Sequence, residues 1–152
     1  MRIEIRRAHP EEADTLTEIA HAAKRHWKYP ESWIQQWQTD LTISGEFIRT
    51  HEVFAAIING AVAGCCALVM TDSLAEIEHM WIKPQQMGSG VGRALFEHAR
   101  ARALERGANA LELSADPYAE GFYARMGAKR IGEIPADMDG ERRVLPRMRI
   151  EL

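Results

Sequence analysis

Continuous and alternating apolar runs predict strands from the beginning of the sequence to its end. Two of them, 53–58 and 62–70, are joined by Asn59-Gly60, a dipeptide typical of two-residue hairpin turns. A turn at residues 71–73 leads into a third run, 75–82. Residues 134–143, with Pro135 and Asp139-Gly140, are expected to form a loop. The remaining strands are expected at residues 2–7, 110–114, 128–132 and 144–152.

The strand at 75–82, the fourth in chain order, has an irregular pattern. Its apolar positions are Ile77, Met80 and Ile82, so the alternation slips by one residue. A β-bulge near Glu78 and His79 would cause this slip and would splay the strand from its neighbour.

Apolar residues spaced three and four apart predict helices between the strands. The first begins near His9-Pro10, and its expected buried face consists of Leu16, Ile19, Ala20 and Ala23. The second begins at Pro30, and the last spans 117–127. A further helix is expected at 94–106, with its buried face formed by Val91, Leu95, His98 and Ala99, then Leu104. The element order implies one α+β domain over residues 1–152, built on a largely antiparallel sheet.

Composition narrows the functional classes. The 152 residues carry a formal charge of −3, and no basic run is present, so a nucleic-acid surface has no support. Cys65 and Cys66 are adjacent and would point to opposite faces of a strand, which argues against a structural disulfide. The histidines show no metal-ligand spacing, so no metal is expected. The sequence shows no signal peptide and no long apolar span, so we expect a cytoplasmic protein with no membrane role.

The most informative stretch lies between the fourth strand and the next helix. Glycines at 88, 90 and 92 lead into the helix, so backbone N–H groups can converge on a phosphate with no Cβ in the way. The stretch lacks the third glycine of a dinucleotide fingerprint, since position 93 is arginine, and no P-loop lysine follows. It resembles the pyrophosphate-binding motif Gln-x-x-Gly-x-Gly-x-Gly of the GNAT superfamily of acetyl-CoA-dependent N-acetyltransferases.

A second stretch, residues 116–127, is similar to the late signature of the same superfamily, N-x-x-A-x-x-F-Y-x-x-x-G-F. Ala119, Phe122, Tyr123 and Gly127 are in register, whereas Asp116 replaces the commoner asparagine and Ala128 the commoner aromatic residue. The resemblance covers roughly residues 53–133. It implies a three-layer fold with a mixed sheet of about seven strands and helices on both faces.

The resemblance also implies an acetyl-CoA (coenzyme A) site. Its cofactor-binding residues would be Met80, Trp81, Ile82, Gln85, Met87, Gly88, Ser89, Gly90, Val91, Gly92, Arg93, Asp116, Tyr118, Phe122 and Tyr123. The free backbone groups of Met80 and Ile82 would pair with the pantetheine arm like an added strand, and the Met80 N–H would face the acetyl oxygen. Tyr123 would donate a hydrogen bond or proton to the CoA sulfur.

The base that would deprotonate the amine is left open. Glu76, Glu78 and His79 lie on the strand that approaches the cofactor site and are the catalytic candidates beside Tyr123. His26 is a further candidate, and an ordered water could replace any of them. Glu76 and Glu78 near aromatic walls favour a cationic small-molecule acceptor.

The acceptor site is predicted in the aromatic segment 25–50. Its candidates are His26, Trp27, Tyr29 and Trp33, although these rings could equally pack the second helix onto the domain. The expected partner is a small-molecule amine or a peptide N-terminus, and the sequence is compatible with a homodimer. Two rival functions stay open: a CoA-binding sensor without turnover, and a fold that binds NAD or ATP.

Overall fold

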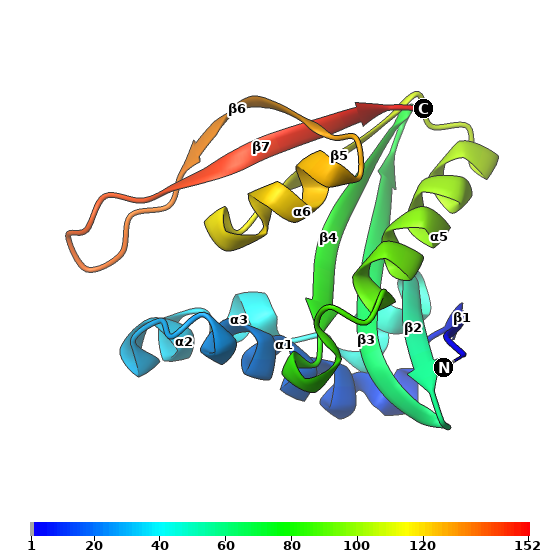
Figure 1. Cartoon of the computed structure of the whole chain (residues 1–152), viewed down its shortest axis with the longest axis horizontal. Coiled ribbons are helices and arrows are strands. Elements are labelled where there is room, and N and C mark those ends of the chain that lie inside the picture. Colours follow the sequence, from blue (N-terminus) through cyan, green and yellow to red (C-terminus); the bar gives the residue numbers. More distant parts are fainter. Residues whose placement is uncertain (1) are drawn as a thin grey trace. The chain divides into compact units, whose positions relative to one another are not determined.

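The computed structural model describes residues 2–152 (Figure 1). The chain divides into two compact units. The first unit consists of residues up to 69 together with 78–99, and the second of 70–77 and 100–152. Strand β4 (Leu74–Ile82) therefore begins in the second unit and ends in the first. The single domain expected over 1–152 stays a prediction.

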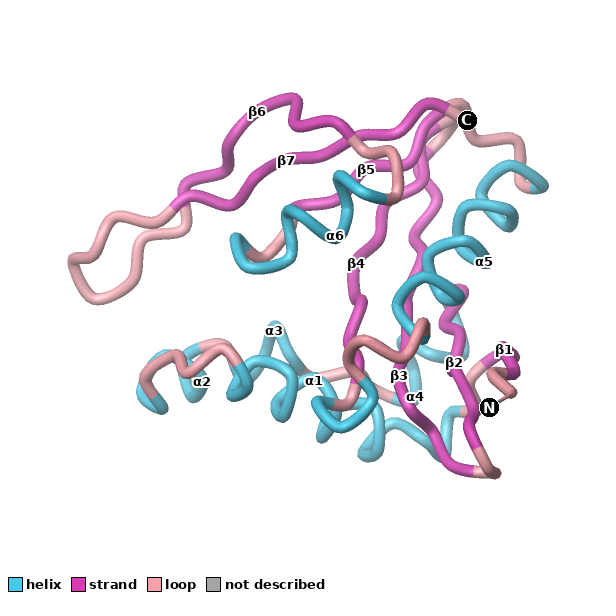
Figure 2. The backbone as a smooth tube through the Cα atoms, viewed as in Figure 1, coloured by secondary structure: helices cyan, strands magenta, loops and turns pink. Residues whose placement is uncertain are grey.

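The seven strands occur at the expected places along the described chain, and two more short helices than predicted precede the second strand (Figure 2). The first unit holds β1 (Glu4–Arg7), η1 (Pro10–Glu12), α1 (Ala13–His26), α2 (Glu31–Gln36), α3 (Gln38–Leu41), α4 (Gly45–Thr50), β2 (Glu52–Ile58), most of β3 (Ala61–Thr71), η2 (Pro84–Gln86) and the start of α5 (Val91–Glu105). The second holds β5 (Ala110–Ser114), η3 (Pro117–Ala119), α6 (Glu120–Arg125), β6 (Lys129–Pro135) and β7 (Val144–Glu151).

Within the described residues, hydrogen bonding connects seven strands in the order β1-β2-β3-β4-β5-β7-β6. The pairs β1–β2, β2–β3, β5–β7 and β6–β7 are antiparallel, and β4–β5 is parallel. The predicted mixed, largely antiparallel sheet is thus confirmed. Register irregularities occur between Ala56 and Ile57 and between Arg130 and Gly132. The bulge predicted in the fourth strand, near Glu78 and His79, stays a prediction.

Helices cover both faces of the strands in the first unit. On one face, α1 and α4 contribute Leu16 and Ile48 to a buried cluster with Val53 of β2 and Cys65 of β3. On the other face lies α5 (Figure 1). Its His98 contacts Phe54 edge to face, with ring centroids 4.5 Å apart. Helices on both faces were expected, and this part of the α+β prediction is confirmed.

Several sequence expectations hold residue by residue, and others need correction. Leu16, Ile19, Ala20 and Ala23 are the buried residues of α1, as predicted. Helix α5 begins at Val91, three residues earlier than expected. Leu104 is 59% exposed and Ala103 is buried, because the core positions of α5 recur every four residues, at 91, 95, 99 and 103. Strand β6 runs through Pro135, which was expected to be in a loop. The short helices α3 and α4 carry no strong sequence period and were not predicted.

Gly64 in β3 allows the end of β4 to pack closely against it. An added Cβ would lie 2.8 Å from the carbonyl oxygen of Trp81, 3.0 Å from Ile82 and 3.1 Å from the side chain of Val91. Two of these neighbours belong to β4 and one to α5, so this glycine sets the position of the segment that connects them.

We predict that Gly64→Ala destabilises the protein by about 1–3 kcal/mol, because the Trp81 carbonyl is main chain and cannot move aside cheaply. For a chain of this length the melting temperature should fall by about 2–12 °C. Gly132→Ala is the matched control, since an added Cβ there meets nothing within 4 Å. A shift for Gly64→Ala no larger than that of the control would contradict this role.

Candidate functional site

The glycine turn connects β4 to α5 through η2 and is held by its own backbone. The Gln86 N–H donates to Lys83 O at 2.8 Å, and both the Ser89 N–H and the Ser89 hydroxyl donate to Gln86 O. Gly88 and Gly90 have φ of +81° and +92°, a region that favours glycine. The turn therefore has a defined backbone conformation that depends on these two glycines.

Backbone amides at the start of α5 could bind an anion. The Ala94 N–H donates to Gly90 O at 3.0 Å and begins the helical pattern. The preceding amides, those of Val91, Gly92 and Arg93, have no acceptor within the helix, and the helix dipole favours negative charge beside them. The Val91 side chain is fully buried, so this residue would reach a ligand only through its main chain. Of the other predicted turn residues, Gln85 is exposed and Met87 half-buried.

The backbone groups at the end of β4 could hold a ligand along one edge of the strand. The Trp81 backbone amide points at the Cys65 sulfur, and the Lys83 N–H donates to Ala63 O at 2.9 Å, so both are directed at β3. Backbone groups of successive strand residues point to opposite sides. The amides of Met80 and Ile82 are therefore directed at the opposite edge.

That edge is paired only at the start of β4. The ladder with β5 joins Leu74 to Ala110, Ala75 to Leu111 and Glu76 to Glu112, and in the described chain it goes no further. Met80 and Ile82 thus lie beyond Glu76, the last residue of β4 that pairs with β5.

Glu76, the first candidate base, is part of an ion-pair cluster in the second unit. The Arg147 guanidinium donates to both of its carboxylate oxygens, at 2.6 and 2.5 Å, and to Glu112 at 2.9 Å. Arg149 donates to the other oxygen of Glu112 at 2.6 Å. Bonding from Arg149 and Arg147 lowers the pKa of Glu112, and bonding to Glu76 raises the pKa of Arg147. Both carboxylate oxygens of Glu76 are thus engaged by one guanidinium, which favours a structural role for this residue.

His79, the third candidate, is held in one neutral tautomer. The Trp81 indole N–H donates to its Nδ1 at 2.9 Å, so the ring proton is on Nε2 because an indole nitrogen only donates. Burial lowers the pKa of His79 to about 4, against a smaller opposing effect of Asp40. At neutral pH the ring is thus a neutral Nε2–H donor rather than a strong base. Glu78 is exposed and lies at the first β4 residue assigned to the first unit.

The predicted acceptor residues separate into two groups. His26 and Trp27 contact each other edge to face, with centroids 4.8 Å apart. Tyr29 and Trp33 belong to a larger cluster with Trp37, with centroid distances of 5.1 to 6.1 Å.

Sequence analysis missed two members of this aromatic cluster. The Lys24 ammonium lies 4.5 Å from the ring centroid of Trp37, 5.1 Å from that of Tyr29 and 5.9 Å from that of Trp81. Trp81 was expected only among the cofactor residues, yet its side chain belongs here. The single available signal was the i, i+5 spacing of Lys24 and Tyr29 across a helix end, which is too weak to identify a contact.

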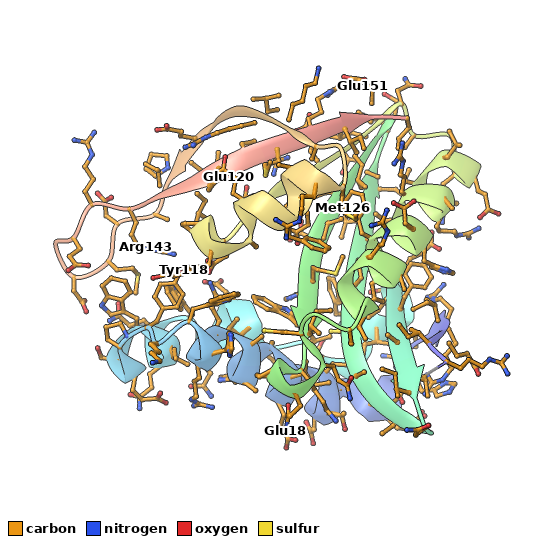
Figure 3. All side chains as sticks on the ribbon, viewed as in Figure 1. Glu18, Tyr118, Glu120, Met126, Arg143 and Glu151 are labelled. Carbon is orange, nitrogen blue, oxygen red and sulfur yellow. The ribbon has the colours of Figure 1, made fainter. Side chains whose placement is uncertain are left out.

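The residues of the late signature gather around α6 in the second unit. Asp116 accepts the Tyr118 N–H at 2.9 Å and caps η3, a role that asparagine and aspartate fill equally well. This explains why Asp116 is tolerated where asparagine is commoner. Tyr118, labelled in Figure 3, is 59% exposed, and Tyr123 is 5% exposed with its ring 5.0 Å from that of Phe122.

The structure gives little support for metal binding, thiol chemistry or a membrane-spanning helix. Across residues 2–152, no three histidine, cysteine, aspartate or glutamate side chains are grouped so as to hold a metal ion. The thiols of Cys65 and Cys66 are free and buried, and burial raises the pKa of both, that of Cys65 to about 12. No helix in the described part of the chain is long and apolar enough to cross a membrane.

Comparison with known proteins agrees with the fold and with the expected family. A family model described as the acetyltransferase (GNAT) family matches residues 14–128. The PaiA N-acetyltransferase of Thermoplasma acidophilum, solved with coenzyme A, superposes with a TM-score of 0.79 at 21% identity, covering 100% of both chains. The ribosomal-protein-S18-alanine N-acetyltransferase of Escherichia coli gives 0.76 at 19% identity over 99% of this chain and 94% of that one. YncA of Salmonella typhimurium, solved with its cofactor acetyl-CoA, gives 0.70 at 18% over 99% and 94%. At these identities the structural likeness establishes the fold.

The state of His79 predicts a pH dependence of stability. Its folded pKa of about 4 lies below the ordinary 6.5, so between these values the unfolded chain binds a proton that the folded protein does not. As the pH falls through this window, His79 should remove on the order of 3 kcal/mol of stability. Denaturant unfolding between about pH 7 and about pH 4 should show a smaller loss for His79→Gln, which keeps an acceptor for Trp81 but does not titrate. Parallel profiles for the two proteins would rule the effect out.

Proposed function

Because the chain belongs to the acetyltransferase (GNAT) family, we propose that it transfers an acetyl group from acetyl-CoA to a primary amine by direct attack of the bound amine. The observation that carries the proposal is the arrangement of backbone amides in the first unit. The amides of Met80 and Ile82 lie at the edge of β4 beyond its ladder with β5. The amides of residues 91–93 lie at the start of α5, which begins eleven residues after Met80. One extended ligand with amides at one end and phosphates at the other matches both sets.

Each group in the chain takes one part of the transfer. When bound, acetyl-CoA supplies a thioester whose carbonyl carbon accepts the amine nitrogen and whose sulfur leaves as a thiolate. The Met80 N–H donates to the carbonyl oxygen as negative charge develops there. The Tyr123 hydroxyl supplies the proton for the sulfur, since a phenol is protonated at neutral pH.

The amine loses its proton to a group that is still to be assigned. Both carboxylate oxygens of Glu76 accept from Arg147, and Nδ1 of His79 accepts from Trp81, so the acceptor atoms of both residues are already engaged. Glu78, which is exposed, and an ordered water are the other candidates. The acceptor is a small-molecule amine or a peptide N-terminus, in the cytoplasm where acetyl-CoA is available, and a homodimer is compatible with this function.

The proposal is tested by release of CoA in the presence of candidate amines. A thiol-reactive dye is suited to this assay because both protein thiols are buried. The panel should contain amino acids, peptide N-termini, aminoglycosides and polyamines. Release that depends on both acetyl-CoA and an amine supports the transferase. A protein that binds acetyl-CoA but releases no CoA with any amine is instead a sensor or interaction module.

Tyr123→Phe should lower turnover at least tenfold and leave acetyl-CoA affinity near that of the wild type, because only the proton donor is lost. Steady-state kinetics and calorimetric titration measure the two quantities separately. Equal losses of affinity and turnover would mean that Tyr123 acts in binding. Unchanged turnover would remove it from the mechanism.

A further inference from the structure

Tyr29, Trp37 and Trp81, which we call the aromatic cage, surround a cation that the chain itself provides. The ammonium of Lys24 lies within 6 Å of all three ring centroids, the range in which cations bind aromatic faces. These are the side chains that would otherwise attract an organic cation. The cage is thus already occupied.

A buried apolar cluster and a nearby ion pair support the cage. Its three rings pack against a buried cluster of Ala20, Ile34 and Leu41. The link from α1 to α2 is tied by Arg25, which donates to Glu31 at 2.8 and 3.2 Å. Lys24 and the cage rings are half-buried, so the cage still has a solvent-facing side.

We propose that Lys24 is a specificity-determining residue: its ammonium fills the aromatic cage and excludes acceptors that carry a second positive charge. This rests on the proposed function and on the cage forming part of the acceptor site. A second cation would have to share the three rings with Lys24 at close range, where like charges repel. Acceptors with a neutral or anionic remainder avoid this cost. The sequence favoured a cationic acceptor because of its aromatic residues and Glu76. The aromatic cage already holds a positive charge and Glu76 is paired with Arg147, so the structure favours the opposite choice.

The first test needs neither acetyl-CoA nor an acceptor. All four tryptophans of the chain, Trp27, Trp33, Trp37 and Trp81, lie in the first unit, two of them in the cage, so tryptophan emission reports on it. Tetramethylammonium is the probe, because it binds aromatic cages and cannot be acetylated. We expect weak quenching in the wild type and at least tenfold tighter binding to Lys24→Ala, which empties the cage.

Two variants separate the cage from a general loss of charge. Lys24→Arg keeps a cation and should exclude the probe as the wild type does. Lys28→Ala removes the same charge four residues away at an exposed position and should also behave as the wild type. If Lys24→Ala fails to fold by circular dichroism, Lys24→Met removes the charge and keeps the stem, and the same gain is expected. No gain in the folded variant, or an equal gain with Lys28→Ala, overturns the proposal.

The second test measures selectivity during turnover. The ratio of kcat/KM for spermidine to that for a neutral-tailed amine should rise at least tenfold in Lys24→Ala and stay unchanged in Lys24→Arg. A Lys24 that only packs α1 against the rings would lower stability and leave this ratio unchanged, which would refute a role in specificity. Absence of turnover in every variant would defeat the proposed function, while the quenching test would still decide the role of Lys24.

Discussion

Two carboxylates, Glu76 and Glu112, face each other at the last paired position of β4 and β5, and Arg147, which bonds both, balances their charge together with Arg149. Directly opposed like charges destabilise a sheet, so this position needs the guanidinium that β7 provides. The ladder ends at this pair, and β4 continues without β5 as a partner. The ion-pair cluster therefore marks the point at which the backbone groups of β4 become available for something other than a strand.

The features of the first unit follow from that freed edge. Gly64 lets the end of β4 pack closely on β3, which takes up the amides of Trp81 and Lys83 and directs those of Met80 and Ile82 the other way. The side chains and the main chain at the end of β4 have different roles. The Trp81 side chain contacts Lys24 in the aromatic cage and donates to His79 Nδ1, while we propose that the neighbouring backbone amides bind the cofactor.

Much of this was predictable from local sequence, because the signals are local. The alternating glycines, the Asn59-Gly60 turn and the period of α1 each specify a conformation within a few residues. The roles of Glu76 and Lys24 were not predictable in this way. Glu76 is 71 residues from Arg147, and Lys24 is 57 positions from Trp81, so both pairings depend on the folded chain. Seen alone, Glu76 resembles a base and the aromatic segment resembles a site for cations.

The central claim is that one ligand spans the β4 edge and the glycine turn, and a thermal-shift series with acetyl-CoA, CoA, NAD and ATP tests it most directly. At 100 times its Kd, a ligand should raise the melting temperature by about 5–11 °C. We predict that acetyl-CoA and CoA alone do so, and that Gly90→Val, at φ +92°, abolishes the shift. Gly107→Val, at φ +85° and the far end of α5, should preserve it. A shift with NAD or ATP alone, or one that survives Gly90→Val unchanged, would contradict the account.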